Sequence, residues 1–355
     1  MPRIKRSIIR KLTDCINPYA LVMAVRNRAF DTGVLKSREF AVPTICVGNI
    51  SVGGTGKTPH IEYITRLLKD EFCVAVLSRG YGRKSKGYVK ANSSSPMQQI
   101  GDEPFQIKNK FMEIDVAVCE KRVNGIEQLI KENNGLQAIL LDDAFQHRHV
   151  KAGLNILLID SNRPVWYDCV MPFGRLRERI SGIKRADIVI MTKCREMTGA
   201  QMTACREFIG RYKNIPVYFS EIKYGKPYLL TDTGKEVEIT TGSRILLVTG
   251  IAKPLPLKSE IERRGATVTL MQYGDHHNFS SSEFEEIAKQ FKEGGYSMIV
   301  TTEKDASRLL NREDLPQTIR DNTYVMPIEM EILNGEGKLF NQNIYNYVTE
   351  NSRNS

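Results

Sequence analysis

Short apolar runs alternate with stretches of helical periodicity from about residue 43 to residue 219. Most of these runs are continuously apolar, which is typical of strands that are covered on both faces. The pattern therefore predicts an α/β fold with a mostly parallel sheet and flanking helices. The predicted strands span residues 44–47, 74–77, 116–119, 138–141, 156–159, 188–191 and 216–219.

The pattern changes after residue 219. Apolar residues at 228–230 and 237–239 flank a turn-forming stretch, which predicts a β-hairpin. A second, smaller alternation then places strands at 245–248, 267–270, 298–300 and 324–326. We therefore expect an N-terminal segment at 1–36, a larger domain at 37–219, a β-hairpin linker at 220–242, a smaller α/β domain at 243–348 and a frayed tail at 349–355.

The stretch Ser51-Val52-Gly53-Gly54-Thr55-Gly56-Lys57-Thr58 lies between a predicted strand and a predicted helix, which is the context of a phosphate-binding loop. Its glycines permit successive N–H groups to point at one anion, and the helix adds its positive dipole end. Lys57 is expected to reach the β- and γ-phosphates of a nucleotide, and Thr58 to bind Mg²⁺. Ser51 stands where the usual motif has its first glycine. The alternative is a glycine-rich turn that caps a buried helix.

Two acidic pairs lie near predicted strand ends. Asp142 and Asp143 follow the strand at 138–141, where a phosphate-binding enzyme keeps the carboxylate that completes a Mg²⁺ shell. Asp102 and Glu103 form an acidic turn, from which Asp102 could take a proton from a hydroxyl or help to bind metal. Carboxylates in such positions also cap helices, and for Asp102 and Glu103 the sequence alone favours that alternative.

Three further stretches combine charged and aromatic residues. Arg175 and Arg177 supply guanidinium groups suited to phosphate contacts, although a solvated helix start has the same composition. The loop at 78–83 is basic and contains Tyr81, which could hold a substrate. His276 and His277 follow Asp275 in the smaller domain, where catalytic support across a domain cleft and simple helix capping are the alternatives.

The net charge of +10 favours a polyanionic partner, which could be nucleic acid, an anionic membrane surface or a phosphorylated substrate. The seven cysteines are scattered without a C-x-x-C pair, which is typical of reduced core residues rather than a disulfide framework or zinc site. Five basic residues precede the short apolar run at 19–25, which is too short to cross a bilayer. This segment either lies in a membrane interface or packs on the domain.

Taken together, these stretches closely resemble the tetraacyldisaccharide 4′-kinase family, the lipid A 4′-kinases of Gram-negative bacteria. The resemblance runs in order from the N-terminal segment to about residue 308, and Ser51 agrees with it. The motifs that carry it are 48–59 (GNISVGGTGKTP), 78–83 (SRGYGR), 101–104 (GDEP), 141–147 (LDDAFQH), 174–178 (GRLRE), 250–254 (GIAKP), 275–277 (DHH) and 302–305 (TEKD).

The resemblance implies a P-loop kinase core that uses ATP and Mg²⁺ to phosphorylate the 4′-hydroxyl of a tetraacylated glucosamine disaccharide 1-phosphate. By motif position, it implies Asp102 as catalytic base and His276 as its partner, with Lys57 and Arg177 stabilising the transferring phosphoryl group. Residues 51–58 would bind the nucleotide. Metal ligands would come from Thr58, Asp142, Asp143 and Glu103, and substrate contacts from Tyr81, Asn49 and Glu178.

The resemblance also implies a place and a set of partners. The acceptor is a membrane lipid, so the basic segment at 1–36 is expected to dock on the anionic inner membrane, at its cytoplasmic face in a Gram-negative bacterium. We expect a monomer without a nucleic-acid partner. The alternative is a P-loop GTPase or metallochaperone-type NTPase, but residues 192–195 (TKCR) lack the aspartate of the guanine-binding motif.

Overall fold

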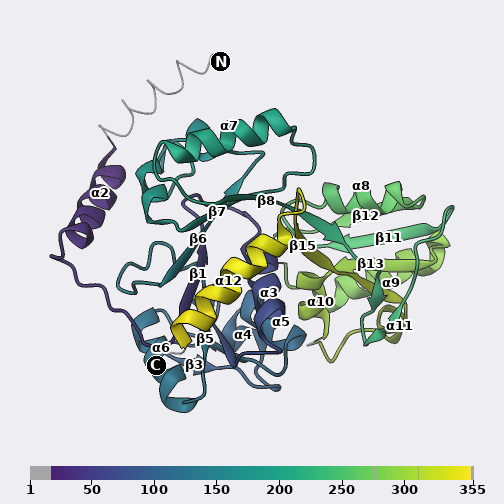
Figure 1. Cartoon of the computed structure of the whole chain (residues 1–355). Coiled ribbons are helices and arrows are strands. Elements are labelled where there is room, and N and C mark those ends of the chain that lie inside the picture. Colours follow the sequence, from purple (N-terminus) through teal and green to yellow (C-terminus); the bar gives the residue numbers. More distant parts are fainter. Residues whose placement is uncertain (1–16, 276, 311, 353–355) are drawn as a thin grey trace.

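The protein is described by a computed structural model that covers residues 17–275, 277–310 and 312–352. A nine-stranded sheet in the order β15-β8-β7-β6-β1-β5-β2-β4-β3 forms the larger domain (Figure 1). Its inner strands are parallel, and only β3 and β15 at the two edges pair antiparallel with their neighbours. The prediction of a mostly parallel α/β sheet is therefore confirmed. The strands are β1 (Thr44–Gly48), β2 (Val74–Ser78), β3 (Val89–Lys90), β4 (Asp115–Val118), β5 (Ala138–Asp142), β6 (Leu154–Asp160), β7 (Ile188–Thr192), β8 (Val217–Tyr224) and β15 (Ile328–Ile332).

Helices cover both faces of this sheet because the central strands are apolar on both sides. One face packs against α3 (Lys57–Leu68), α5 (Asp102–Lys110) and α12 (Gly337–Ser352). The other face packs against α6 (Arg122–Glu132), α7 (Gly199–Gly210) and the 3₁₀ helix η2 (Ile180–Arg185). The short elements α4 (Met97–Ile100) and η1 (Val165–Tyr167) lie in connections.

The smaller domain is built on a six-stranded sheet in the order β10-β9-β14-β13-β11-β12. Four parallel strands are extended at one edge by an antiparallel hairpin of β9 and β10. Its elements are β9 (Tyr228–Leu229), β10 (Asp232–Glu236), β11 (Arg244–Thr249), α8 (Leu255–Arg263), β12 (Thr267–Gln272), α9 (Ser281–Gly294), β13 (Met298–Thr302), α10 (Glu303–Leu310), α11 (Gln317–Asn322) and β14 (Thr323–Met326).

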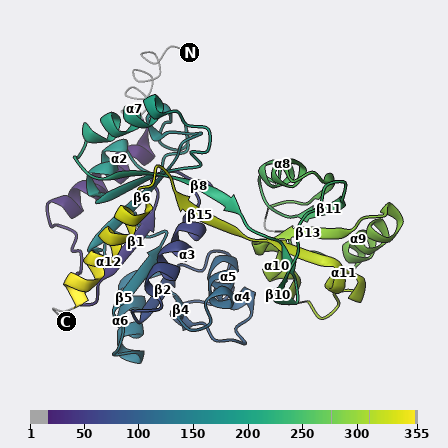
Figure 2. The ribbon, with the colours of Figure 1, turned by 45° about the vertical axis from the view of Figure 1, so that its right-hand side comes forward.

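The division between the domains differs from the prediction. The chain returns to the larger domain after β14, because β15 pairs with β8 over Ile328 to Ile332 and α12 buries Phe340, Ile344 and Val348 in the larger core. The hairpin predicted as the linker belongs to the smaller sheet. The antiparallel ribbon of β8 and β15 joins the two domains instead (Figure 2). These strands are about a hundred residues apart, so their pairing leaves no local pattern in the sequence.

The described part of the N-terminal segment is the helix α2 (Pro18–Asp31), which Asn17 caps by accepting a hydrogen bond from Ala20 N. The five basic residues predicted to assist membrane docking lie outside the described residues. Leu21, Val22 and Val25 are 55–63% exposed on α2. Within the described residues, no helix combines the length and apolar character needed to span a membrane.

Candidate active site

The predicted phosphate loop connects the end of β1 to the start of α3 and has internal supports. Gly53 and Gly56 adopt φ values of 108° and 87°, a region that favours glycine. The Asn49 amide, which is fully buried, donates a hydrogen bond to the Thr55 hydroxyl at 2.7 Å, and Thr55 N donates to Gly53 O at 3.0 Å. The hydrogen bond from Asn49 therefore restrains the loop. The N-terminus of α3 adds backbone N–H groups that are suited to bind an anion.

The two aspartates at the end of β5 lie beside this loop because β5 pairs with β1, with Val47 opposite Asp142. Lys57 Nζ lies 3.7 Å from Asp143 Oδ2. The Ser78 hydroxyl, at the end of β2, donates a hydrogen bond to Asp142 Oδ2 at 3.0 Å. The fold therefore gathers groups from the ends of three neighbouring parallel strands, which is where α/β sheets bind ligands.

The two aspartates have opposite electrostatic environments. Asp142 is 2% exposed, and its burial together with the nearby Glu103 and Asp143 carboxylates raises its pKa. Burial also opposes ionisation of Asp143, but Lys57 and Arg177 outweigh this effect and lower the pKa of Asp143. Asp143 is thus held as a carboxylate by two cations, whereas Asp142 is a buried acid close to other acids.

Arg177 reaches Asp143 from a segment that is fastened to the phosphate loop. Its guanidinium donates to both carboxylate oxygens of Asp143 at 2.9–3.1 Å, and to Gln146 Oε1 at 3.2 Å. The segment is fixed because Arg177 N donates to Ile50 O and Val52 N donates to Arg175 O, both at 2.8 Å. Arg177, Asp143 and Lys57 therefore form one charged group at the loop.

The donor set fits a magnesium ion that is shared with a nucleotide. Within the described part of the chain, the buried Asp142 Oδ1 has no hydrogen-bond partner, and burial beside the Glu103 and Asp143 carboxylates raises the pKa of Asp142. Thr58, 6% exposed, is the second residue of α3 and stands in the position expected for a hydroxyl ligand. Among the described residues no three or more His, Cys, Asp or Glu side chains converge as a metal cluster. Mg²⁺ characteristically uses one or two carboxylates plus phosphates rather than such a cluster.

Two residues predicted to contact substrate, Asn49 and Glu178, are buried. Glu178 is 1% exposed and accepts hydrogen bonds from Asn27, Gln146 and Arg185 at 2.7–3.0 Å. Asn49 supports the phosphate loop from a fully buried position. Both side chains are enclosed by protein groups and have little surface to offer a substrate, and their contact with substrate stays a prediction.

Asp102 and Glu103 begin α5, on the side of the larger domain that faces the smaller one. Gly101 has a φ of 91°, and a Cβ atom there would lie 2.9 Å from Tyr81 O, so the two loops touch at this glycine. Tyr81 itself is 80% exposed. Asp102 pairs with Arg308, and Glu103 pairs with Lys304. Arg308 and Lys304 belong to α10 of the smaller domain. The structure therefore places Asp102, Glu103 and Tyr81 at the domain junction.

His276 lies outside the described residues, and its pairing with Asp102 stays a prediction. The adjacent His277 has partners of its own within the smaller domain. Its Nε2 atom lies 3.0 Å from both carboxylate oxygens of Glu283, and its ring stacks on Tyr273 with centroids 5.0 Å apart. Glu283 also completes the capping box of α9 with Ser280. These contacts give His277 an anchoring role.

Sequence reasoning missed Lys193, which follows β7. Its ammonium donates a hydrogen bond to Gly54 O at 2.6 Å and pairs with Asp160 Oδ2 at 2.5 Å. The backbone of Lys193 has a φ of 62°. This left-handed conformation is uncommon for residues other than glycine and is found more often at functional sites. The signal in the sequence was the position of Lys193 directly after the strand predicted at 188–191, because the carboxyl ends of parallel strands meet at one edge of the sheet.

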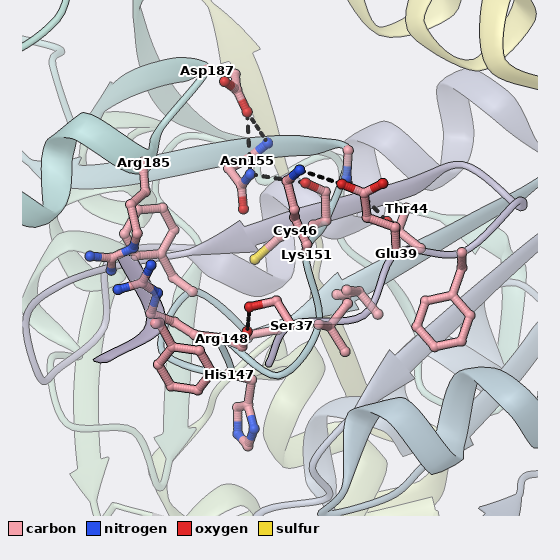
Figure 3. A pocket seen from close by; sticks show the side chains of 18 of the residues that line it. Ser37, Glu39, Thr44, Cys46, His147, Arg148, Lys151, Asn155, Arg185 and Asp187 are labelled. Carbon is pink, nitrogen blue, oxygen red and sulfur yellow. Dashed lines mark hydrogen bonds and ion pairs between the residues drawn. The ribbon is translucent and has the colours of Figure 1, made fainter. Parts of the chain in front are cut away.

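A separate cavity of about 1030 Å³ shares no residue with the phosphate loop (Figure 3). It is bounded by the connection between α2 and β1, by the start of β6 and by the loop after β5. The three cations labelled in Figure 3 have partners: Lys151 pairs with Glu39, Arg185 with Glu178 and Arg148 with Asp31. Lys57, Asp142, Asp143 and Arg177 are not among the residues that line this cavity.

The comparisons with known proteins show the family of the chain. The family model described as tetraacyldisaccharide-1-P 4′-kinase (LpxK) matches residues 12–348. The chain belongs to this kinase family. A relative from Bacteroides thetaiotaomicron named tetraacyldisaccharide 4′-kinase is 44% identical over 351 residues, which cover 95% of this chain and 92% of the relative. One of the same name from Bacteroides fragilis strain YCH46 is 46% identical over 346 residues, covering 95% and 92%.

A solved structure gives the same result at the level of the fold. LpxK from Aquifex aeolicus, in a crystal structure described as a complex with ATP, is similar with a TM-score of 0.73 and 26% sequence identity. The match covers 98% of this chain and 100% of that chain. The P-loop NTPase-like fold is thus confirmed, the family is one of ATP-utilising lipid A kinases from bacteria, and the GTPase or metallochaperone alternative is less supported.

Proposed function

We propose that this chain transfers the γ-phosphoryl group of ATP to the 4′-hydroxyl of a tetraacylated glucosamine disaccharide 1-phosphate. The observation that carries the proposal is the group of Lys57, Asp143 and Arg177 at the phosphate loop. It supplies two cations where a transferring phosphoryl group would lie, in a chain that belongs to a family named for this reaction. Phosphoryl transfer depends mainly on such positioning and charge stabilisation.

Each predicted residue has a part in this proposal. Residues 51–58 would hold the phosphates through backbone N–H groups, and Lys57 would contact the β- and γ-phosphates. Arg177 would stabilise charge on the transferring group, because its planar guanidinium is suited to phosphate oxygens. Lys193 would keep the loop in place through Gly54. Asp143 would orient both Lys57 and Arg177.

We propose that Mg²⁺ is held by Thr58 and Asp142, with Asp143 and Glu103 nearby to hold its water ligands. When bound, the ion would supply positive charge that offsets the negative charge of the nucleotide phosphates. The buried, unpartnered Oδ1 atom of Asp142 supports this assignment. Ser78 restrains the carboxylate through its other oxygen, which orients Oδ1.

We propose that Asp102 is the general base that takes the proton from the acceptor hydroxyl, with His276 as its partner. Its place at the start of α5, at the domain junction and next to the Tyr81 loop, supports this role. The highly exposed Tyr81 ring is suited to contact the sugar or the nucleotide. A base in this position acts on a hydroxyl that must come within about 3 Å.

The contacts of α2 support peripheral membrane binding. One side of the helix reaches the active-site segment, because the Tyr19 hydroxyl donates to Arg177 O at 3.0 Å and Asn27 donates to Glu178. The exposed Leu21, Val22 and Val25 are available to enter a lipid surface. We propose that this helix docks a monomeric enzyme on the cytoplasmic face of the inner membrane of a Gram-negative bacterium, close to its lipid acceptor.

The direct test follows radiolabel from [γ-³²P]ATP onto the tetraacylated disaccharide 1-phosphate, with the extracted lipid analysed for a second phosphate at the 4′ position. Transfer to the lipid that requires Mg²⁺ and is lost in a Lys57→Met variant is the expected result. Release of inorganic phosphate without labelled lipid, or a preference for GTP, would contradict the proposal.

A further inference from the structure

The helices α5 and α10 connect the two domains through ion pairs. Glu303, at the start of α10, pairs with Lys110 at the end of α5 at 2.6 Å. Arg308, toward the end of α10, pairs with Asp102 at the start of α5 at 2.5 Å. Lys304 and Glu103 form a third, longer pair at 3.6 Å. The TEKD motif at 302–305 and the residues just after it therefore account for the contact between the larger and smaller domains at the proposed base.

Arg308 is the most enclosed cation of this junction. Its side chain is 3% exposed, and it is held by Asp305, whose Oδ1 atom accepts a hydrogen bond from Arg308 Nη1 at 2.8 Å. Asp305 is fully buried, and its other oxygen accepts from the Thr249 hydroxyl, the Thr302 hydroxyl and Gly250 N at 2.7–3.1 Å. The guanidinium is therefore fixed to the ends of β11 and β13 before it reaches Asp102.

The close packing at Gly250 reinforces this support. A Cβ atom at Gly250 would lie 3.2 Å from Asp305 Oδ1 and 3.1 Å from His277 Cβ. The backbone at Gly250 thus packs tightly against Asp305 on one side and against the segment with His277 on the other. The GIAKP motif at 250–254, like TEKD, consequently begins with a residue that contributes to the support of Arg308.

We infer that Arg308 is a positioning residue for Asp102. The inference rests on the proposed role of Asp102 as the general base. Arg308 Nη2 donates to Asp102 Oδ2, which restrains rotation of the carboxylate and fixes it relative to the smaller domain. The carboxylate takes its reactive orientation only when the smaller domain is docked, so domain docking and the geometry of the base are coupled.

A positioning role and a purely structural role predict different kinetic effects when the Arg308 side chain is removed. Misplacing a reacting group by about 1 Å costs on the order of a hundredfold in rate. Loss of Arg308 is therefore expected to lower kcat, while the ATP site at the phosphate loop and its KM remain close to normal. If Arg308 acts through Asp102, its removal has no further effect once Asp102 can no longer act as a base.

The chain offers a matched control. Arg195, after β7, pairs with Glu260 of α8 at 3.6 Å and so also links the two domains, but away from Asp102. Arg195 is more exposed, and Glu260 retains Arg263 and Arg264 as partners. An Arg195→Met variant consequently removes a cross-domain ion pair without changing the support of Asp102, and its kcat should stay within about twofold of the unaltered enzyme.

The experiment measures kcat and KM for ATP in the full-length enzyme and in five variants: Arg308→Met, Arg308→Lys, Asp102→Asn, the double variant with Arg308→Met and Asp102→Asn, and Arg195→Met. Arg308→Lys keeps the charge but loses the planar fork that reaches two carboxylates. It replaces Arg308→Met in the double variant if the methionine form does not fold, as judged by its thermal unfolding.

We expect both Arg308 variants to lower kcat by about 10- to 100-fold with KM for ATP changed by less than about threefold, and this loss to vanish in the Asp102→Asn background. An equal loss in both backgrounds, a change confined to KM, or the same loss in Arg195→Met would overturn the inference. Unchanged kcat in Asp102→Asn alone would instead remove Asp102 from the role of base, so the two failures are distinguishable.

Discussion

Lys57 Nζ lies 3.7 Å from Asp143 Oδ2, and the same carboxylate accepts three hydrogen bonds from Arg177. One acid thus holds the lysine of the phosphate loop and the arginine of a distant segment in a single arrangement. The carboxylate is only partly exposed, so solvent screens these attractions incompletely. Asp143 is therefore expected to control the placement of both cations.

Replacing Asp143 by asparagine should release both cations from this arrangement. We expect Asp143→Asn to lower kcat by about 100-fold or more, comparable with the loss of one preorganised charge contact in the transition state. Transfer of radiolabel to the lipid acceptor measures the effect, with Arg195→Met as the control for a surface ion pair. A kcat within a few fold of the unaltered enzyme would show that Lys57 and Arg177 keep their places without Asp143.

The role proposed for Asp142 predicts a specific dependence on magnesium. Asp142→Asn removes the buried charge that Oδ1 would offer to the ion, so the Mg²⁺ concentration for half-maximal activity should rise by about tenfold or more. Asp115→Asn is a suitable control because Asp115 pairs with Lys90 away from the phosphate loop. An unchanged Mg²⁺ requirement in Asp142→Asn would exclude Asp142 as a ligand.

Gly48, the last residue of β1, is needed for close packing. A Cβ atom there would lie 2.7 Å from Phe145 Cβ and 3.1 Å from Phe145 N. We expect Gly48→Ala to reduce the free energy of unfolding by about 1–3 kcal/mol, because the Phe145 backbone would have to move. Denaturant unfolding measures this, and Gly54→Ala is the control, since a Cβ at Gly54 meets no atom within 4 Å. Equal stability of both variants would contradict the packing argument.

The burial of His60 predicts that the folded protein loses stability in acid. It is 1% exposed, its ring nitrogens contact Gly56 O at 2.7 Å and the Ser220 hydroxyl at 3.0 Å, and burial lowers its pKa to about 4. The unfolded chain, in which histidine has a pKa near 6.5, binds more protons between these values, so stability falls as the pH decreases from about 6.5 to 4. At pH 5 this effect of His60 amounts to about 2 kcal/mol.

The measurement is denaturant unfolding at pH 7.5 and pH 5 in the unaltered protein and in His60→Gln. The variant is expected to be less stable at pH 7.5, since it loses the fitted imidazole, but to lose less further stability on acidification. His147, whose burial also lowers its pKa to about 4, remains in both proteins and contributes equally. An identical pH dependence in the two proteins would rule out His60 as a cause.

The exposed apolar side of α2 predicts membrane affinity. Replacing Leu21, Val22 and Val25 together by serine should weaken sedimentation with anionic phospholipid vesicles by about tenfold or more, because each buried aliphatic side chain contributes on the order of 1 kcal/mol. Leu339→Ser is the control, since Leu339 is 59% exposed on α12. Undiminished sedimentation of the triple variant would assign vesicle binding to another part of the chain.

Local patterns were sufficient for much of this protein. The continuous apolar runs predicted the parallel strands, and the glycine-rich stretch with Lys57 and Thr58 predicted the phosphate loop, because both depend on residues that are neighbours in the sequence. The position of Asp142 and Asp143 after a strand also predicted their place beside the loop. Carboxyl ends of parallel strands meet at one edge of a sheet, so this step needed only the strand pattern.

Tertiary structure alone decided three other features. The pairing of β8 with β15 placed the last helix on the larger domain. Hydrogen bonds from Asn27, Gln146 and Arg185 enclosed Glu178. The contact between α5 and α10 brought Arg308 to Asp102. Each of these contacts joins residues that are distant in the sequence, except the contact between Glu178 and Arg185. Such contacts arise from the packing of whole elements, so no local periodicity or motif spacing records them.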